Sequence, residues 1–498
     1  MDWRPEYFEL TIKSYFQKKR FLMPDEPIHY LSISALTRCY RDHSLSPLEV
    51  VRHLLARIQK SDPWLKSFLQ ITPERALEEA RRAEQAWRRR ENPGPLCGVP
   101  YAVKYLFDVR GVPTTAGTRL RKNAVAGSDS WAVHRLTRAG MVLLGKTQTV
   151  QFAYGGVGIN HDQGTPLNPW KRIPHVPGGS SSGSAVAVAS GLVPAALGTD
   201  TGGSVRIPAA LCGIVGLKTT VGRVGRSGVY PLSFRLDSIG PLARSVQDAA
   251  LVGRELQGID PGDETTHPVP LADWSAGLKA GLAGLRLGLV ETVFSDQADP
   301  EVEASLREAE TILGSAGAMV ESLDLPEAAE VIQNPHTPLI TAAEACVVNH
   351  DYLERHFDEL DPVIARRMVK GRQLSAVDYL STWKHWEVLR TRVRRRLQGF
   401  DALIVPTTPI AAAPLEAVDL NLESYYAYNA RYLRNTFIGN VLNLCAVSVP
   451  CGFTRQGLPL GLMIYAQPFE EALALRIAFA YEQATDWHRR RPDLSWIA

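Results

Sequence analysis

Residues 178–225 constrain the fold of this chain more than any other segment does. The segment is rich in glycine and serine at both ends, and the small apolar run AVAVASGLVPAALG lies between them. A flexible linker would not contain such a run, so we interpret it as a buried helix followed by a short strand. The small residues around it permit close packing and allow the backbone to lie against a ligand. The pattern therefore predicts a buried segment that takes part in a binding or catalytic site.

The composition of the 498 residues is that of a folded protein. Hydrophobic residues make up 45% and charged residues 21%, which excludes a disordered or collagen-like chain. The 55 Lys and Arg against 52 Asp and Glu leave a net charge of only +3, so neither nucleic acid nor an anionic membrane is expected as the main partner. No segment has the length and hydrophobicity of a signal peptide or of a membrane span. The six cysteines form no CxxC pair, which indicates a reducing cytoplasm and argues against disulfides or a zinc site.

Short β-like runs alternate with helical stretches after residue 94, which indicates an α/β sandwich over a largely buried sheet. The predicted strands are residues 99–103, 141–144, 285–290, 402–405 and 445–449. The predicted helices include residues 130–138, 301–316 and 470–485, preceded by two helices within residues 32–60 and one that begins at residue 73. We expect residues 1–30 to be an N-terminal lead-in and residues 31–498 to form one domain, in which residues 300–400 are mostly helical.

Three kinds of site could use the glycine- and serine-rich segment. A Walker-type phosphate loop needs Gly-Lys-Ser/Thr before a helix, and that lysine is absent. A nucleophile elbow needs G-x-S-x-G, which residues 179–183 match with Ser181 at the centre, and it also needs an acid and a histidine downstream. Several histidines follow Ser181 in the sequence, but none lies in a sequence pattern typical of a catalytic histidine. A Ser-His-Asp esterase that uses Ser181 is thus one alternative, and a site built from two serines and a lysine is the third.

The third kind of site resembles that of the amidase signature family. The segment GGSSSGSAVAVASGLVPAALGTDTGGSVRIPAALCGIVGLK corresponds closely to the defining motif of that family, and GVPYAVKYLFDVRGVPTTAGT resembles its lysine motif. The C-terminal segment that begins VSVPCGFTRQGLPLG resembles its closing strand and helix. The resemblance extends over about residues 30–492. It implies a single amidase signature domain, an α/β/α sandwich around a large twisted mixed β-sheet.

The resemblance also implies a catalytic triad and its supports. Lys104 matches the catalytic lysine of the family, Ser180 the bridging serine on a cis peptide, and Ser204 the nucleophile that forms the acyl-enzyme. Asp200 and Arg206 match flanking positions that we interpret as structural supports. The implied oxyanion hole consists of the backbone amides of Thr201, Gly202, Gly203 and Ser204.

The chemistry of such a triad follows from its residue types. A serine hydroxyl needs a base, and a lysine can act as one only when it is neutral. The run AVKYLF would bury Lys104, and burial can lower a lysine pKa from about 10.4 to about 7 or 8. The Ser180 hydroxyl, both donor and acceptor, would relay a proton from Ser204 to Lys104 and later return one to the leaving amine. Neither a metal nor a cofactor is required.

The amide substrate is open between two classes. The family contains stand-alone hydrolases and the glutamine-hydrolysing A subunit of a tRNA-dependent amidotransferase. This chain has Gln151 where the family often has Glu, and we do not find the segment resembling LGTYALSSGYYDAYY that the amidotransferase chain usually has. We therefore expect a stand-alone amidase acting on a small-molecule amide and water, without a nucleic-acid or membrane partner. The glutamine-hydrolysing amidotransferase chain is the alternative, and a homodimer is a candidate oligomeric state.

Aromatic residues near the motifs are candidates for the walls of the substrate pocket, which suggests an aryl or otherwise apolar group on the substrate. The candidate substrate-binding residues are Gln151, Phe152, Tyr154, Gly179 and Tyr230. Further candidates for the walls are the turn at residues 230–234 and Trp383, Trp386, Tyr425, Tyr426 and Tyr428.

Overall fold

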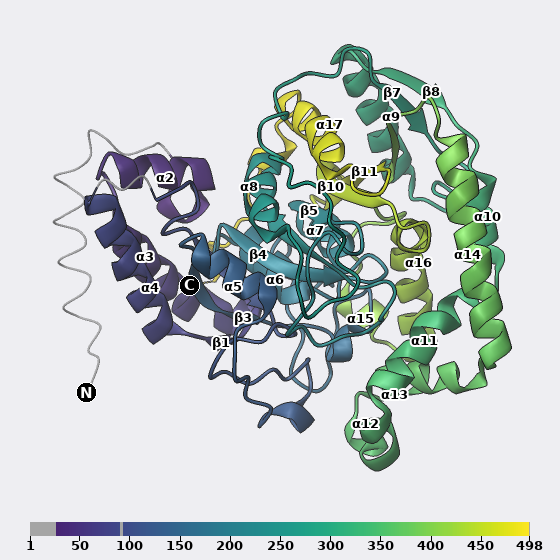
Figure 1. Cartoon of the computed structure of the whole chain (residues 1–498), viewed down its shortest axis with the longest axis horizontal. Helices are drawn as coiled ribbons and strands as arrows, with labels where there is room; N and C mark the ends of the chain where they lie inside the picture. Colours follow the sequence, from purple (N-terminus) through teal and green to yellow (C-terminus); the bar gives the residue numbers. More distant parts are fainter. Residues whose placement is uncertain (1–25, 90–92, 498) are drawn as a thin grey trace.

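An 11-stranded sheet forms the centre of the computed structural model, which describes residues 26–89 and 93–497 (Figure 1). Its strand order is β1-β3-β2-β4-β6-β5-β10-β11-β9-β7-β8. The strands are β1 Phe68–Ile71, β2 Pro100–Lys104, β3 Val142–Thr147, β4 Ala195–Asp200, β5 Val215–Lys218, β6 Ser238–Ala243, β7 Arg286–Leu289, β8 Met319–Ser322, β9 Ala402–Pro406, β10 Cys445–Phe453 and β11 Pro459–Ala466. Strands from residue 68 to residue 466 thus share one sheet.

The sheet is mixed. β2 runs parallel to β3 and to β4, and β7 runs parallel to β8 and to β9. The strands between these two groups, from β4 through β6, β5, β10 and β11 to β9, pair antiparallel. The expected large mixed sheet is therefore confirmed.

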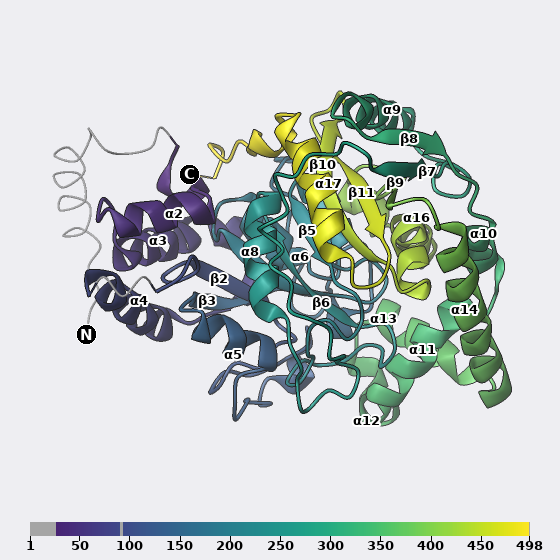
Figure 2. The ribbon, with the colours of Figure 1, turned by 45° about the horizontal axis from the view of Figure 1, so that its top comes forward.

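Helices cover both faces of the sheet. Successive residues of a strand point to opposite faces, so neighbouring residues of β2 show what lies on each side. In β2, Tyr101 and Val103 belong to a buried cluster that includes residues of α5, α8, α9 and α17, whereas Ala102 belongs to a cluster that includes residues of α3, α4, α6 and α7. Figure 2 shows α8 and α17 side by side across the first of these faces. The fold is thus the predicted α/β/α sandwich.

The helices lie between the strands in chain order. One group of them gathers at one end of the molecule. Helices α10 to α14 gather at the end of the molecule opposite α2, α3 and α4 (Figure 1). The helices are α2 Ile33–Arg41, α3 Pro47–Leu65, α4 Pro73–Arg88, α5 Trp131–Arg138, α6 Ser182–Ala189, α7 Arg206–Cys212, α8 Val246–Leu256, α9 Pro300–Ser315, α10 Pro326–Gln333, α11 Thr337–Val348, α12 His350–Arg355, α13 Pro362–Val369, α14 Ala376–Arg396, α15 Leu415–Val418, α16 Leu422–Val441 and α17 Glu471–Gln483.

The two helices expected within residues 32–60 are α2 and α3, and the helix expected from residue 73 is α4. The Ser46 side chain accepts from the Glu49 amide and the Glu49 side chain accepts from the Ser46 amide, so α3 begins with a capping box. The predicted helices at residues 130–138, 301–316 and 470–485 correspond to α5, α9 and α17. The five predicted strands correspond to β2, β3, β7, β9 and β10. Most of the expected lead-in, residues 1–25, lies outside the described residues.

No helix among the described residues has the length and hydrophobicity that crossing a membrane requires.

Candidate active site

The segment at residues 178–225 folds as expected into a buried helix, α6, followed by a buried strand, β4. Small residues are required there. A Cβ atom on Gly183 would lie 2.3 Å from the carbonyl oxygen of Ser67, and one on Gly198 would lie 2.6 Å from Ser181 Oγ. The segment therefore packs with its backbone directly against β3 and the neighbouring loops, and its two serine-rich ends lie close to the end of β2.

Lys104 is the last residue of β2, and its side chain is completely buried. Its Nζ donates to Ser180 Oγ at 2.8 Å and to Thr199 Oγ1 at 2.8 Å. Burial lowers the pKa of Lys104 to about 7, against the opposing effect of the Asp237 and Asp200 carboxylates. A large fraction of this amine is therefore neutral near pH 7.

The backbone around Ser180 is held by several contacts. The Gly179–Ser180 peptide bond is cis. The Ser180 carbonyl accepts from the Thr149 hydroxyl at 3.0 Å and from the Val150 amide at 3.3 Å. Its side chain is fully buried against Lys104.

Ser204 lies in the turn between β4 and α7, next to the Ser180 segment. The Ser181 amide donates to the Ser204 carbonyl at 3.2 Å, so the two serine-rich ends of the motif are in contact. Ser204 is 4% exposed and lines a cavity, whereas Ser180 is 0% exposed. Of the two serines, only Ser204 is thus accessible from that cavity.

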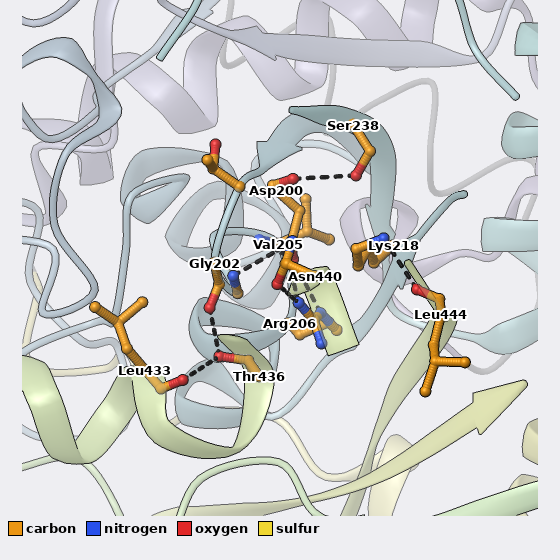
Figure 3. A network of polar contacts seen from close by, with 12 residues as sticks. Asp200, Gly202, Val205, Arg206, Lys218, Ser238, Leu433, Thr436, Asn440 and Leu444 are labelled. Carbon is orange, nitrogen blue, oxygen red and sulfur yellow. Dashed lines mark hydrogen bonds and ion pairs between the residues drawn. The ribbon is translucent and has the colours of Figure 1, made fainter. Parts of the chain in front are cut away.

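A buried ion pair fixes the turn that carries Ser204 (Figure 3). Asp200 and Arg206 are both inaccessible to solvent, and the guanidinium contacts the carboxylate twice, with Nε–Oδ2 at 3.0 Å and Nη2–Oδ1 at 2.9 Å. Burial acts to raise the pKa of Asp200, but Arg206 and Lys218 outweigh it and hold that pKa well below its usual range. The Asp200 carboxylate also accepts from the Gly203 amide at 2.9 Å and from the Val205 amide at 3.1 Å.

This network corrects one part of the expected oxyanion hole. Because the Gly203 amide donates to Asp200, it is not free to donate to a developing oxyanion. The amides of Gly202 and Ser204 donate to no other group in the part of the chain that the structure describes. Gly203 instead serves the turn geometry, since its φ of 133° is strained for any residue with a side chain.

Helix α16 supports the same turn from residues that sequence patterns did not point to. Asn440 donates to Asp200 Oδ1 at 2.9 Å and accepts from Arg206 at 2.6 Å. Thr436 Oγ1 donates to the Gly202 carbonyl at 2.6 Å (Figure 3). These residues lie more than 230 positions from the turn in sequence, so no local motif could have indicated them.

Asp237 and Thr199 are further buried groups at the site that the sequence analysis missed. Asp237 Oδ1 accepts from the Thr201 hydroxyl at 2.5 Å, and Oδ2 accepts from the amides of Leu232 and Ser233. Burial raises the pKa of Asp237, although these hydrogen bonds oppose the shift. Asp237 thereby links the turn after β4 to the loop at residues 231–237.

A cavity of about 640 Å³ opens onto Ser204. Thr201, Gly202 and Ser204 contribute to its lining, together with side chains from α10, α11, α13 and α16. The apolar part of the lining includes Leu232, Leu339, Leu433 and Phe437. Arg367, Lys370, Arg431 and Arg434 also line it, and sequence analysis did not single them out.

Of the expected wall residues, Tyr154, Tyr426 and Leu232 of the turn at residues 230–234 line this cavity. Gln151, Phe152, Gly179 and Tyr230 do not line it, so the lining does not support a substrate-binding role for them. The Gln151 side chain accepts from the Asp361 amide, and Phe152 stacks on Tyr230 at 5.9 Å between ring centres.

Other expected wall residues also have their own local contacts away from this cavity. Gly179 is packed against backbone, since a Cβ there would lie 2.8 Å from Gly158 Cα. Tyr230 lines a separate cavity with Arg121 and Tyr352. Trp383, Trp386, Tyr425, Tyr428 and Phe234 also lie outside the lining of the Ser204 cavity.

Ser181 has none of the surroundings that a nucleophile elbow needs. It is fully buried, and its hydroxyl donates to the Thr199 carbonyl at 3.3 Å. No histidine hydrogen-bonds to it among residues 26–89 and 93–497. Within those residues there is also no group of three or more His, Cys, Asp or Glu side chains that could hold a metal ion.

Known proteins show the same family across nearly the whole chain. The family model described as Amidase matches residues 49–475. The protein named as the A subunit of the Glutamyl-tRNA(Gln) amidotransferase in Chloroflexus aggregans is 38% identical over 490 residues, which cover 94% of this chain and 99% of that protein. Both similarities extend over most of the chain.

Two solved structures also resemble this chain over more than nine-tenths of its length. A structure from a vestigial protein complex, described as revealing the evolutionary origins of an s-triazine catabolic enzyme, has a TM-score of 0.84 and 33% identity and covers 91% of this chain and 98% of its own. A 6-aminohexanoate cyclic dimer hydrolase with bound substrate has a TM-score of 0.86 and 27% identity over 94% of this chain and 99% of its own. The chain belongs to the amidase family, also called the amidase signature family.

Proposed function

We propose that the chain hydrolyses carboxylic amides through Ser204, Ser180 and Lys104. Ser204 attacks the amide carbonyl and passes its proton to Ser180, which passes its own proton to the neutral Lys104 amine. The 2.8 Å contact between the buried Lys104 Nζ and Ser180 Oγ carries this proposal. The return of the proton along the same path makes nitrogen a leaving group, and water then hydrolyses the acyl-enzyme.

The oxyanion of the tetrahedral intermediate needs donors beside Ser204. The amides of Gly202 and Ser204 are the candidates, with Thr201 next to them at the end of β4. The loss of one such donor typically costs about 2.7 to 4 kcal/mol of transition-state stabilisation. Asp200 and Arg206 act as positioning residues, because they hold the turn from which these amides project.

The relatives support a second candidate for the finer activity, the glutamine-hydrolysing chain of a tRNA-dependent amidotransferase. The 38% identity to the protein of Chloroflexus aggregans over 94% of this chain favours it more directly than any comparison favours a stand-alone amidase. On this candidate, ammonia released from glutamine would pass to partner subunits and a tRNA-bound substrate.

The cavity favours the stand-alone amidase that sequence analysis preferred. Among the described residues that line it, none is Asp or Glu, whereas four are Arg or Lys. Glutamine carries a carboxylate, which such a lining suits, but also an ammonium group, which it does not neutralise. A small-molecule amide without that group fits the lining better.

The test is ammonia release by the purified full-length chain, together with mass spectrometry of acid-quenched enzyme. We expect turnover of small-molecule amides by the chain alone and a transient acyl adduct on the peptide that contains Ser204. Turnover of glutamine only, and only after amidotransferase partner subunits have been added, would instead establish the amidotransferase role. An adduct elsewhere, or none with any turned-over amide, would refute the triad.

A further inference from the structure

Four cationic side chains line the Ser204 cavity and come from two helical segments. Arg367 lies on α13 and Lys370 begins the 3-10 helix Lys370–Gln373, while Arg431 and Arg434 lie on α16. Within each pair the residues are three apart, a spacing that places side chains on one face of a helix. The two helical segments therefore present their positive charges to the same cavity.

Three of the four cations have no carboxylate partner among the described residues. Arg367 donates to the Tyr154 carbonyl at 2.6 Å, with its guanidinium carbon 4.1 Å from the centre of the Tyr154 ring. Lys370 Nζ lies 5.2 Å from the centre of the Tyr426 ring. Arg434 donates to the carbonyl of Phe294 at 3.2 Å and to the side chain of Asn435. Each thus keeps N–H donors that no anion satisfies.

The fourth cation is only partly neutralised. Arg431 Nη2 lies 3.7 Å from Asp299 Oδ1, and both side chains are substantially exposed. A pair at that distance and exposure contributes little. Burial lowers the pKa of the neighbouring Arg434, with Asp296 opposing and Arg431 reinforcing the shift. The positive potential in the cavity is therefore largely uncompensated.

Some partly buried arginines elsewhere in this protein have acidic partners at short range. Arg75 pairs with Asp129 and Glu79 at 2.8 Å, and Arg226 pairs with Asp263 at 2.9 Å. Others, such as Arg57 and Arg390, donate to backbone carbonyls and have no carboxylate partner among the described residues. The half-buried Arg367 and Arg434 differ from these because they line the cavity that holds Ser204. Uncompensated guanidinium groups in a concave site are suited to bind a carboxylate with two hydrogen bonds.

We propose that the substrate is an amide that carries a carboxylate and no ammonium group, such as the monoamide of a dicarboxylic acid. The proposal rests on the proposed function and narrows it. Arg367 and Arg434 are the candidate carboxylate-binding residues, with Lys370 and Arg431 adding positive potential. Leu339, Leu433 and Phe437 line the same cavity and provide contacts for the hydrocarbon part between the carboxylate and the amide.

The first test compares amides of matched length with the full-length enzyme. Succinamate, glutaramate and adipamate are measured against the neutral butanamide, pentanamide and hexanamide, and glutaramate against glutamine. We expect kcat/KM for at least one anionic amide to exceed that of its neutral match by about tenfold or more, since one charge-assisted contact is worth that much. Glutamine should lie at least tenfold below glutaramate. Equal values in all three neutral comparisons, or glutamine turned over as well as glutaramate, would overturn the proposal.

The second test changes the charges. Arg367→Gln and Arg434→Gln should each lower the ratio of anionic to neutral kcat/KM by at least fivefold. Arg395→Gln, which removes an exposed charge at the end of α14, is the matched control and should leave the ratio unchanged. A ratio that falls equally in all three variants, or in none of them, would contradict a local carboxylate site.

A third measurement avoids variants altogether and separates the two proposals. Glutarate should slow the labelling of Ser204 by a fluorophosphonate in the wild-type chain, and cadaverine, a dication of similar length, should not. If the fluorophosphonate does not label Ser204, the proposed function itself fails. If it labels Ser204 and cadaverine protects as well as glutarate, or neither does, only the anionic substrate is refuted.

Discussion

Lys104 Nζ lies 2.8 Å from Ser180 Oγ, and both side chains are completely buried. An ammonium group in that position would have lost its hydration, and the nearest carboxylates, Asp237 and Asp200, only partly compensate for it. The neutral amine is therefore stabilised by the fold, and it is the form that can accept a proton.

This relationship predicts the pH dependence of amide hydrolysis. Since burial lowers the pKa of Lys104 to about 7, kcat/KM should rise with pH and level off above about pH 8. Below pH 7 each pH unit should cost close to tenfold, because only the neutral fraction is active. Rates measured between pH 5 and 9 in buffers of constant ionic strength provide the test. A profile that is flat from pH 5 to 8 would rule out Lys104 as the base.

The same shift predicts a change in stability with pH. Between the folded pKa of about 7 and the unfolded value of 10.5, the unfolded chain binds a proton that the folded chain does not, so stability rises with pH. The free energy of unfolding of wild type minus that of Lys104→Met should therefore rise by up to about 1.4 kcal/mol per pH unit above pH 7.

Urea unfolding at pH 7, 8 and 9 measures this difference. Lys384→Met, at an exposed lysine of α14, is the matched control and should give a difference that does not vary with pH. A constant difference for Lys104→Met as well would show that Lys104 is charged in the folded protein.

Local patterns predicted the parts of the fold that local contacts determine. The helices that became α3 and α17 were expected from short stretches of sequence, and the capping box at Ser46 and Glu49 shows that neighbours in sequence determine where α3 begins. The glycine- and serine-rich motif indicated a buried segment because its run of small apolar residues is also continuous in sequence. Short strands such as β5 and β8 were missed, since four residues carry too little periodicity to distinguish a strand from a loop.

The walls of the cavity could not be predicted in this way. Arg367 is next to the exposed Arg366 on α13, and nothing local in the sequence separates a cavity arginine from a solvated one. Phe152 and Tyr230 are aromatic and lie near the motifs, yet they stack on each other outside the cavity. Which side chains meet at the site depends on how α11, α13 and α16 are placed around the turn after β4, which is a long-range property.

The buried Asp200–Arg206 pair should be far more sensitive than a surface pair. Arg206→Met would leave Asp200 charged, buried and without its main partner, and we expect a loss of about 3 to 5 kcal/mol of stability. Arg286→Met, which breaks the exposed pair with Glu321, should cost no more than about 1 kcal/mol. Urea unfolding midpoints of the two variants measure this. Equal losses would mean that Asp200 finds another partner.

Gly203 should tolerate no side chain. A Cβ there would lie 2.1 Å from Thr436 Oγ1, and the φ of 133° disfavours any other residue, so Gly203→Ala should cost about 1 to 3 kcal/mol. Amide hydrolysis should fall at least a hundredfold, because the turn carries Ser204 and the candidate oxyanion donors. Gly277→Ala, where nothing lies within 4 Å of the added Cβ, is the control. Full activity in Gly203→Ala would show that the turn geometry is not needed.

Ser181 and Ser180 are adjacent, and their contacts give them different roles. Ser180→Ala removes the contact with Lys104 and should lower kcat by at least a thousandfold. Ser181→Ala removes only a 3.3 Å hydrogen bond to the Thr199 carbonyl and should lower kcat by less than tenfold. Steady-state ammonia release measures both variants. The reverse order of effects would favour a nucleophile at Ser181.

The most direct measurement is the site of covalent labelling by a fluorophosphonate, mapped by peptide mass spectrometry in wild type, Ser204→Ala and Lys104→Met. We predict one adduct, on Ser204, that is absent in Ser204→Ala and forms much more slowly in Lys104→Met. An adduct on Ser181, or one on Ser204 that forms equally fast without the lysine, would contradict the triad.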